Sequence, residues 1–418
     1  MNHIGDSLSQ SYSQEEESAL CNAVLPYDNS QENLGLAQSI TVQAILNSDT
    51  LREYFDNLQC VKSLYAAGNG ETSRYFIFKG CDAVTGHKVV LKVTNPAFQN
   101  ATNDEENLKW ESAILEYLKN KKRCQQIVKS FNSTKIDLLR DDKAFRETVF
   151  YIATQNLDKD IKKAFFDAKD TSLENIANRL TIFISIIHAV QALHKNGICH
   201  RDIKPSNFMG KTENLKCVVK TIDFGSSLAT EDIERKIKKY SPAVQTSKLY
   251  AAPELTNGFS NNSELARKAD IYALGCMLFE LLDKRLYFNA MKDANTEFFK
   301  AINYCTVDEN DFGGDFAQRI NKYNSLLSSY AANLNIPQFA ENSVIPDYEK
   351  NKLQKIIESM CNFDYRKRIA DEGLEDVKNT LRTVIRALKN AHLLQIRKQR
   401  KQIQKMHRKE KNNYRGAF

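Results

Sequence analysis

Two short polar motifs, separated by a short apolar run, most restrict how this chain can fold. The first occupies 200–207 and reads His-Arg-Asp-Ile-Lys-Pro-Ser-Asn, and the second is Asp-Phe-Gly at 223–225. The apolar run 218–222 between them predicts a strand that sets Asp223 at its end, aimed back at Asn207. The fold is therefore expected to bring a loop and a strand end together around one group of polar side chains.

The side chains of these motifs match the parts that phosphoryl transfer to an alcohol requires. That reaction needs a carboxylate to orient and deprotonate the hydroxyl, oxygen ligands for Mg²⁺, and cations over the phosphates. Asp202 can supply the carboxylate, and Asn207 with Asp223 can supply the magnesium ligands. Lys204 can help to neutralise the transferring phosphoryl group.

The two motifs resemble the catalytic loop and the magnesium-binding motif of eukaryotic-type serine/threonine protein kinases. Further matches follow in the family's order: Val-Val-Leu-Lys at 89–92 is similar to its Val-Ala-Ile-Lys, and 252–254 is Ala-Pro-Glu. The resemblance covers about residues 60–375 and implies ATP and Mg²⁺ as cofactors. It also implies a bilobal α+β fold, with a small β-rich N-lobe that holds one main helix and a larger, mostly helical C-lobe.

The resemblance gives roles to two residues of the small lobe. Lys92 would contact the α- and β-phosphates of ATP and pair with a helix glutamate. In the predicted helix 103–118, Glu111 stands at the family's usual offset, so we pair it with Lys92. The other glutamates of this region fit a solvated helix face: Glu105, Glu106 and Glu116.

A glycine-containing loop is expected to cover the phosphates. Gly68, Asn69 and Gly70 begin a segment similar to the family's Gly-x-Gly-x-x-Gly, and glycine N–H groups can approach phosphate oxygens because no Cβ intervenes. Ser73 stands at the third glycine. Tyr75 stands at the usual valine and Val90 at the usual alanine, so both would place larger side chains over the adenine.

The linker between the lobes is expected to follow the strand 148–154. Residues Gln155 to Asp158 would then pair with adenine through their backbone. Asp160 would reach the ribose, or else lie in an ordinary polar turn before a helix.

The expected substrate is a serine or threonine hydroxyl of a protein. Lys204, two residues after Asp202, resembles the serine/threonine-directed subgroup, and Ser247 stands where that subgroup places a threonine near both. Choline- and aminoglycoside-type kinases generally lack the Ala-Pro-Glu and Lys-Pro-x-Asn motifs. Arg201 implies that a phosphorylated residue of the activation segment 223–254 is bound there, so we expect autophosphorylation. The alternative is a pseudokinase or nucleotide-gated scaffold, which the departures at 73, 75 and 90 favour.

Around these motifs the sequence predicts five regions. They are a polar, disordered tail at 1–32, a helical extension at 33–59, an N-lobe at 60–154, a C-lobe at 155–375 and a basic helical extension at 376–418. Short β-prone runs predict strands at 61–65, 74–78, 88–93, 126–131 and 148–154. After about Leu157 the apolar spacing becomes helical and stays so.

The positive charge is concentrated at the C-terminal end. Nine Lys or Arg residues and one acid lie between Gln395 and Phe418, whereas the whole chain carries a formal net charge of +7. The body is therefore close to neutral, and only the tail at 397–415 is a candidate for an acidic partner, nucleic acid or an anionic membrane surface. A solvated helix without a partner is the alternative.

Composition and apolar runs indicate the compartment. The most apolar stretch, 180–193, is interrupted by polar residues and falls short of a bilayer span. The nine cysteines are scattered, with no Cys-x-x-Cys pair, which favours a reducing compartment. We expect a cytoplasmic protein without a membrane span, with a nuclear location as a second option in a eukaryote.

Overall fold

The computed structural model describes residues 36–61, 74–96, 101–119, 121, 124, 127–139, 146–213, 216–237, 247–340 and 344–415. The chain divides into two compact units. The first comprises Met1–Lys162 and Ala189–Asp270, and the second comprises Lys163–His188 and Ile271–Phe418. All the side chains predicted for catalysis and magnesium binding belong to the first unit.

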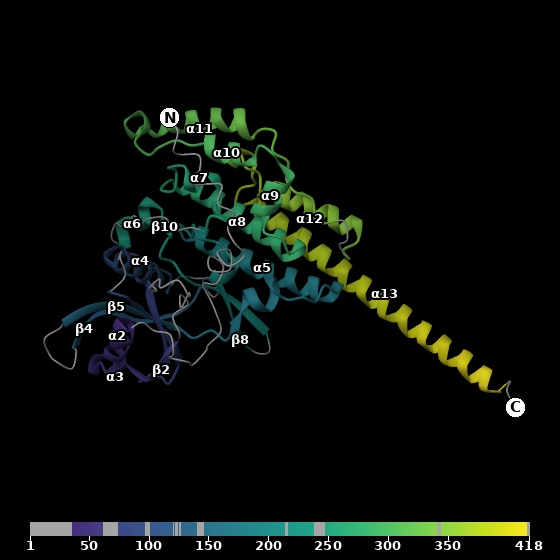
Figure 1. Ribbon diagram of the computed structural model, residues 1–418, viewed down its shortest axis with the longest axis horizontal. Helices are drawn as coiled ribbons and strands as arrows, with labels where there is room; N and C mark the ends of the chain where they lie inside the picture. The colour runs from purple at the N-terminus through teal and green to yellow at the C-terminus, as the bar shows by residue number, and fades with distance from the viewer. Residues whose placement is uncertain are drawn as a thin grey trace. The chain divides into compact units, whose positions relative to one another are not determined.

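The first unit is built on a five-stranded antiparallel sheet (Figure 1). Its strands are β1 (Phe55–Val61), β2 (Tyr75–Asp82), β3 (Lys88–Thr94), β4 (Ser130–Leu139) and β5 (Arg146–Gln155). They lie in the order β1-β2-β3-β5-β4. The helix α4 (Ala101–Lys119) connects β3 with β4, so this part of the fold confirms the predicted α+β class.

Each face of the sheet packs against different helices, because successive side chains of a strand point to opposite faces. On one face, Phe76, Phe78 and Leu91 share a core with residues of α2 (Leu36–Leu46) and α3 (Asp49–Tyr54). On the other, Phe150 and Ile152 of β5 share a core with the apolar residues of α4.

Two predictions in this region need correction. The first strand begins at Phe55, inside the range 33–59 that we expected to be helical, because Phe55 packs into the sheet core directly after α3. The strand expected at 126–131 instead occupies Ser130–Leu139, where buried Ile136 and Leu138 alternate with polar residues.

Short strands hold the two polar motifs. The strand β7 (Ile198–Cys199) pairs with β10 (Leu228–Ala229), and β8 (Phe208–Glu213) pairs with both β6 (Lys159–Asp160) and β9 (Lys216–Thr221). The motif at 200–207 therefore lies between β7 and β8, and Asp223 follows β9 as expected. Apart from the strand at 218–222, this part was expected to be helical, and that was wrong because strands of two to six residues are too short to show a period.

The remaining elements are helical. In the first unit these are α6 (Glu231–Ile237), α7 (Pro253–Thr256) and the 3₁₀ turn η2 (Pro205–Asn207). Both α5 (Leu173–Lys195) and α8 (Ser263–Asp283) contribute to the two units. The second unit adds η1 (Lys162–Phe166, from its second residue), α9 (Tyr287–Ala294), α10 (Phe298–Tyr304), η3 (Asp311–Gly314), α11 (Phe316–Leu326), η4 (Leu327–Ala331), α12 (Asp347–Met360), η5 (Tyr365–Lys367) and α13 (Gly373–Arg415).

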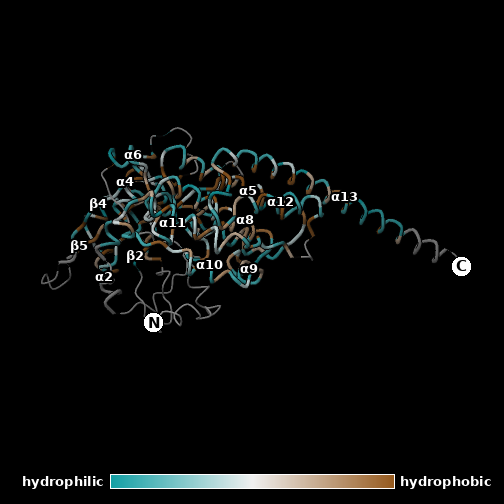
Figure 2. The backbone as a smooth tube through the Cα atoms, turned by 90° about the horizontal axis from the view of Figure 1, so that it is seen from above, coloured by the Kyte–Doolittle hydropathy of each residue, from teal (hydrophilic) through white to brown (hydrophobic). Residues whose placement is uncertain are grey.

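Apolar residues are concentrated in the central helices (Figure 2). Among the described residues, only α5 has the length and hydropathy of a membrane span, and 78% of its most apolar window is buried inside the protein. In the second unit, Phe279 stacks on Phe339 with ring centroids 5.7 Å apart, and the Tyr287 hydroxyl donates to the Cys361 carbonyl at 3.1 Å. Burial of the α5 window and the packing of Phe279 in α8 give both helices the character of core helices.

A glycine of α8 allows the end of α12 to approach closely. A Cβ added to Gly275 would lie 2.8 Å from the Cβ of Met360 and closer still to the Cys361 sulfur. We expect Gly275→Ala to lower the free energy of unfolding by about 1–3 kcal/mol, because overpacking outweighs the gain in helix propensity of about 1 kcal/mol. Urea denaturation would measure this. In a Cys361→Ala background part of the loss should be recovered, and equal losses in both backgrounds would contradict the packing explanation.

Candidate active site

The loop at 200–207 is held by a buried aspartate of α8. The Asp270 carboxylate accepts hydrogen bonds from the backbone N–H groups of His200 at 2.7 Å and Arg201 at 2.8 Å. It also lies 2.9 Å from Nε2 of His194. Arg201 has a φ of 63°, a left-handed conformation that costs a non-glycine residue energy unless its surroundings fix it. Asp270 therefore determines the turn that presents Asp202.

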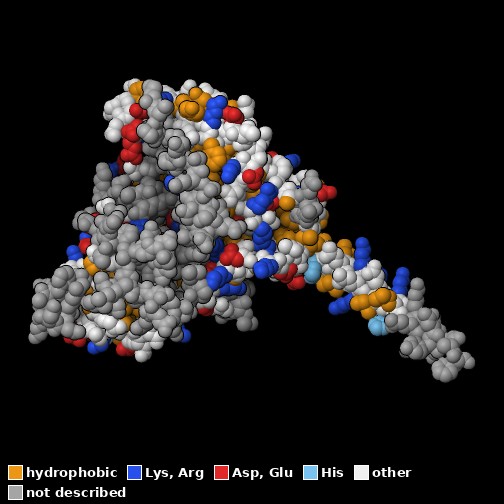
Figure 3. Space-filling model, viewed as in Figure 1, with side chains coloured by type: hydrophobic (Ala, Val, Ile, Leu, Met, Phe, Trp, Pro, Cys, Tyr) orange, Lys and Arg blue, Asp and Glu red, His pale blue; other side chains and the backbone are white. Residues whose placement is uncertain are grey.

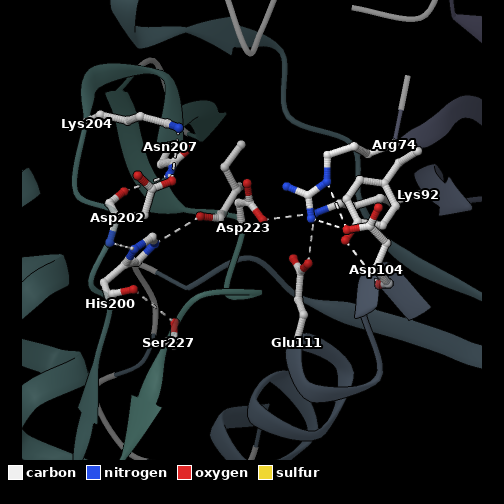
Figure 4. A network of polar contacts seen from close by, with 12 residues as sticks. Arg74, Lys92, Asp104, Glu111, His200, Asp202, Lys204, Asn207, Asp223 and Ser227 are labelled. Atoms are coloured by element: carbon white, nitrogen blue, oxygen red, sulfur yellow. Dashed lines mark hydrogen bonds and ion pairs between the residues drawn. The ribbon is translucent and has the colours of Figure 1, made fainter. Parts of the chain in front are cut away.

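The Asp202 carboxylate contacts two other predicted site residues, Lys204 and Asn207 (Figure 4). Its Oδ2 accepts a hydrogen bond from Asn207 Nδ2 at 2.9 Å and lies 3.0 Å from the Lys204 ammonium. Its Oδ1 accepts the backbone N–H of Ser247 at 3.1 Å. The structure thus brings Asp202, Lys204 and Asn207 together, with Ser247 beside them.

The Lys92 ammonium joins three elements of the first unit (Figure 4). It lies 3.0 Å from Glu111 Oε2 on α4 and 2.9 Å from Asp223 Oδ1 after β9. Burial alone would lower the pKa of Lys92, but the carboxylates of Asp223 and Glu111 raise it above its usual value. Burial alone would raise the pKa of Asp223, and the charge of Lys92 outweighs burial and lowers it. Both groups are therefore charged at neutral pH.

The two predicted magnesium ligands offer suitable oxygens. Asn207 uses its Nδ2 on Asp202, and no described residue donates to its Oδ1. Asp223 engages Lys92 through one carboxylate oxygen, and its side chain is 42% exposed. Carboxylate and amide oxygens are the ligands that Mg²⁺ prefers, so this donor set fits the ion.

The residues predicted to bind the nucleotide are distributed as follows. Gly68, Asn69 and Gly70 lie outside the described residues. Thr154 pairs with Val90 on β3, and Gln155 ends β5 with its N–H bound to the carbonyl of Lys129 at 2.8 Å.

The segment after Gln155 is tied to β8. Asp158 donates its N–H to the Gly210 carbonyl at 3.1 Å, and its carboxylate accepts from the Thr212 N–H at 3.1 Å. Asp160 pairs with Met209 in the β6–β8 ladder. Leu157 lies between Gln155 and Asp158. Its backbone N–H donates to no described acceptor. Leu157 is therefore the better candidate for backbone pairing with adenine, and the ribose contact of Asp160 stays a prediction.

Arg201 is bound by carbonyl groups of the first unit, and its contact with a phosphorylated residue stays a prediction. Its guanidinium is buried and donates to the carbonyls of Ser226 at 2.6 Å, Ser260 at 2.9 Å and Ser227 at 3.3 Å. Burial lowers its pKa to about 10, so it remains charged. In this conformation Arg201 joins the turn after Asp223 to the loop before α8.

Tyr75 contacts Lys92 and α4, and its place over the adenine stays a prediction. The β2 residue opposite Lys92 is Ile77, whereas Tyr75 pairs with Thr94, farther along β3. The Tyr75 ring lies 4.5 Å from the Lys92 ammonium, and its hydroxyl donates to the Asp104 carbonyl on α4 at 3.1 Å. Tyr75 therefore packs against Lys92 and α4.

A second ion pair links β2 to α4, and the sequence did not reveal it. Arg74 binds the carboxylate of Asp104, with its Nε at 2.9 Å, and Asp104 is almost completely buried. One residue before Glu111, the Trp110 indole N–H donates to the Ser227 carbonyl at 2.8 Å. Trp110 is the single tryptophan of the chain and lies in a helix rich in charged residues. Its presence there could have indicated a buried contact.

The Arg74–Asp104 pair should support the position of Glu111. We expect Arg74→Ala to lower the free energy of unfolding by about 2–3 kcal/mol, because it leaves the buried Asp104 carboxylate without its cation. Phosphoryl transfer should fall with it, since α4 then holds Glu111 less firmly. Lys109→Ala removes exposed pairs with Glu105 and Glu106 on the same helix and should cost less than about 1 kcal/mol. Equal effects of the two variants in urea denaturation and activity assays would refute a special role for Arg74.

Comparison with known proteins agrees with this geometry. A family model described as "Protein kinase domain" matches residues 62–392. The chain is 30% identical over 222 residues to "Extracellular signal-regulated kinase 2" of Dictyostelium discoideum, which covers 52% of this chain and 54% of that protein. It is 37% identical over 142 residues to "Eukaryotic translation initiation factor 2-alpha kinase 3" of Rattus norvegicus, covering 32% of this chain and 12% of that protein.

A third relative has a similar name. "Serine/threonine-protein kinase NLK2" of Xenopus laevis is 33% identical over 141 residues, covering 34% of this chain and 29% of that protein. The chain thus matches about half the length of the first of these relatives and less of the others. The match of the family model to most of the chain, together with the five-stranded sheet, the helical remainder and the assembled site, shows that the chain belongs to the protein kinase family and has its bilobal fold.

Proposed function

We propose that this protein transfers the γ-phosphoryl group of ATP to serine or threonine hydroxyls of protein substrates, with Mg²⁺ as cofactor. The observation that carries the proposal is the charged Lys92, placed 3.0 Å from Glu111 and 2.9 Å from Asp223 in the same unit as the Asp202 site. A lysine held between two carboxylates is poised to exchange one of them for phosphate oxygens. The names of the three relatives support the same reaction, because each contains the word kinase and one reads serine/threonine-protein kinase.

Asp202 can orient the substrate hydroxyl and accept its proton. Among the described residues, only the Ser247 N–H donates to its Oδ1, and a carboxylate oxygen can accept two hydrogen bonds. The remaining position is open to the hydroxyl. Lys204, at 3.0 Å from Oδ2, can face the transferring phosphoryl group.

Asn207 and Asp223 would hold the magnesium ion. When bound, the ion neutralises phosphate charge and supports in-line transfer. Lys92 binds the phosphates, and Glu111 keeps its ammonium in place. The preference for serine or threonine rests on Lys204 and on Ser247, which both contact the Asp202 carboxylate.

Two aspartate variants should separate binding from chemistry. Asp202→Ala should lower transfer of labelled γ-phosphate by at least about a hundredfold while ATP still binds, because the proton acceptor is lost. Asp223→Asn should also weaken Mg²⁺-dependent nucleotide binding. Asp232→Ala, an exposed aspartate of α6, is the control and should leave both properties unchanged. A wild-type protein that binds ATP without transferring phosphate would favour the scaffold or pseudokinase alternative.

Autophosphorylation, if it accompanies this activity, should fall on particular residues of the activation segment 223–254. Ser226 and Ser227 are buried in the turn that Arg201 holds, so they are poor acceptors. We expect mass spectrometry of the ATP-treated protein to place phosphate on Ser241 or Thr246, both outside the described residues. The Asp202→Ala protein provides the background. Phosphate on Ser226 or Ser227 would contradict the buried turn.

A further inference from the structure

The last helix of the chain packs on the rest of the second unit through its first half only. In α13, residues up to Leu388 pack into the second unit, and His392 lies 3.1 Å from Glu174 of α5. Beyond that point the described side chains are mostly exposed, and they include four large apolar ones: Leu393, Leu394, Ile403 and Met406, each 48–59% exposed. Figure 3 shows orange apolar and blue basic side chains together on this part of α13.

The charge of this helix has one sign. Between Val377 and Lys409 the sequence contains eleven Lys or Arg residues and no Asp or Glu. An exposed helix is normally supported by opposite charges three or four residues apart, whereas like charges at that spacing destabilise it. Arg397, Lys401 and Lys405 follow one another at four-residue intervals. This charge pattern destabilises a helix that is surrounded only by water. An anionic surface would neutralise the repulsion between the basic side chains.

The apolar residues identify the kind of anionic surface. At 100° per residue, Leu393, Ile396 and Ile403 fall within an arc of about 80°, beside the arc that holds Arg397, Lys401 and Lys405. Leu394 falls among those basic residues, Met406 lies outside both arcs, and Lys389 lies within the apolar arc. Nucleic acid would neutralise the basic arc but would leave the apolar arc in water. A membrane interface accepts both, since the apolar face enters the acyl boundary and the basic residues meet the headgroups.

We propose that residues 389–407 of α13 bind an anionic lipid membrane, lying in its interface as an amphipathic helix. Six described basic residues would face or flank the headgroups: Lys389, Arg397, Lys398, Arg400, Lys401 and Lys405. Arg400 lies within the apolar arc and can extend its head to the lipid surface. Anionic lipids are enriched on the cytoplasmic leaflet, which agrees with the predicted cytoplasmic location. The proposal does not depend on phosphoryl transfer.

Sedimentation of the full-length protein with vesicles tests the charge requirement. Vesicles of phosphatidylcholine with about a third phosphatidylserine should bind the protein, and phosphatidylcholine alone should bind it much less. Replacing Arg397, Lys398, Lys401 and Lys405 with Gln should weaken binding by at least about a hundredfold, since each basic residue contributes about 1 kcal/mol at such a surface. Gln is a good helix former, so the helix itself should persist.

A matched control changes the net charge equally. Lys292, Lys300, Lys322 and Lys355 are exposed lysines on α9, α10, α11 and α12, and their replacement with Gln should leave vesicle binding unchanged. Equal losses in the two quadruple variants would show that only the net charge acts, and would overturn the proposal. So would equal binding of the wild type to both kinds of vesicle, or binding to neither.

The apolar arc distinguishes a membrane from other polyanions. Ile396→Gln with Ile403→Gln should also weaken vesicle binding, by at least about tenfold, because two buried apolar side chains are lost. In a Leu393→Trp variant, anionic vesicles should shift tryptophan emission to shorter wavelength, whereas polyuridylate and polyglutamate should not. Tighter binding to either polymer than to the vesicles, with the isoleucine variant unaffected, would assign the helix to nucleic acid or an acidic protein and refute the membrane.

Discussion

The ammonium group of Lys92 is the interaction on which the first unit depends. It lies on β3 and contacts a carboxylate from α4 and another from the segment after β9. These three elements are far apart in the sequence, and each carries a charge that would be costly to bury alone. Leaving any one of these charges unpaired would cost free energy, so the three elements stay together. The nucleotide site is therefore assembled by the same charges that would act on the phosphates.

Further contacts surround this bridge and hold the elements that supply it. Arg74 and Tyr75 fasten β2 to the first turn of α4, and Trp110 fastens the middle of α4 to the carbonyl of Ser227. The same carbonyl accepts a hydrogen bond from Arg201 of the catalytic loop. A buried aspartate, Asp270, fixes that loop from the other side. The catalytic geometry is thus maintained by protein contacts alone within the first unit.

The sequence was a good guide where chemistry demands particular residues at fixed spacing. Asp202, Lys204 and Asn207 lie within one short loop, so their proximity could be predicted, and the pairing of Lys92 with Glu111 followed from a resemblance to the family. The places of Tyr75 and Arg201 could not be predicted, because they depend on strand register and on which carbonyls a buried guanidinium meets. The register of β2 sets Ile77 opposite Lys92 and Tyr75 opposite Thr94. The two-residue strands β7 and β10 were missed because so few residues carry no periodicity.

Trp110 has one more consequence, because it is the only tryptophan of the chain. Its indole is buried against the turn that follows Asp223, and it lies one position from the glutamate that holds Lys92. Any movement of α4 away from that turn would expose the ring to water and break its hydrogen bond. The intrinsic fluorescence of the unlabelled protein therefore reports a single event, the opening or closing of the contact between α4 and the turn that follows Asp223.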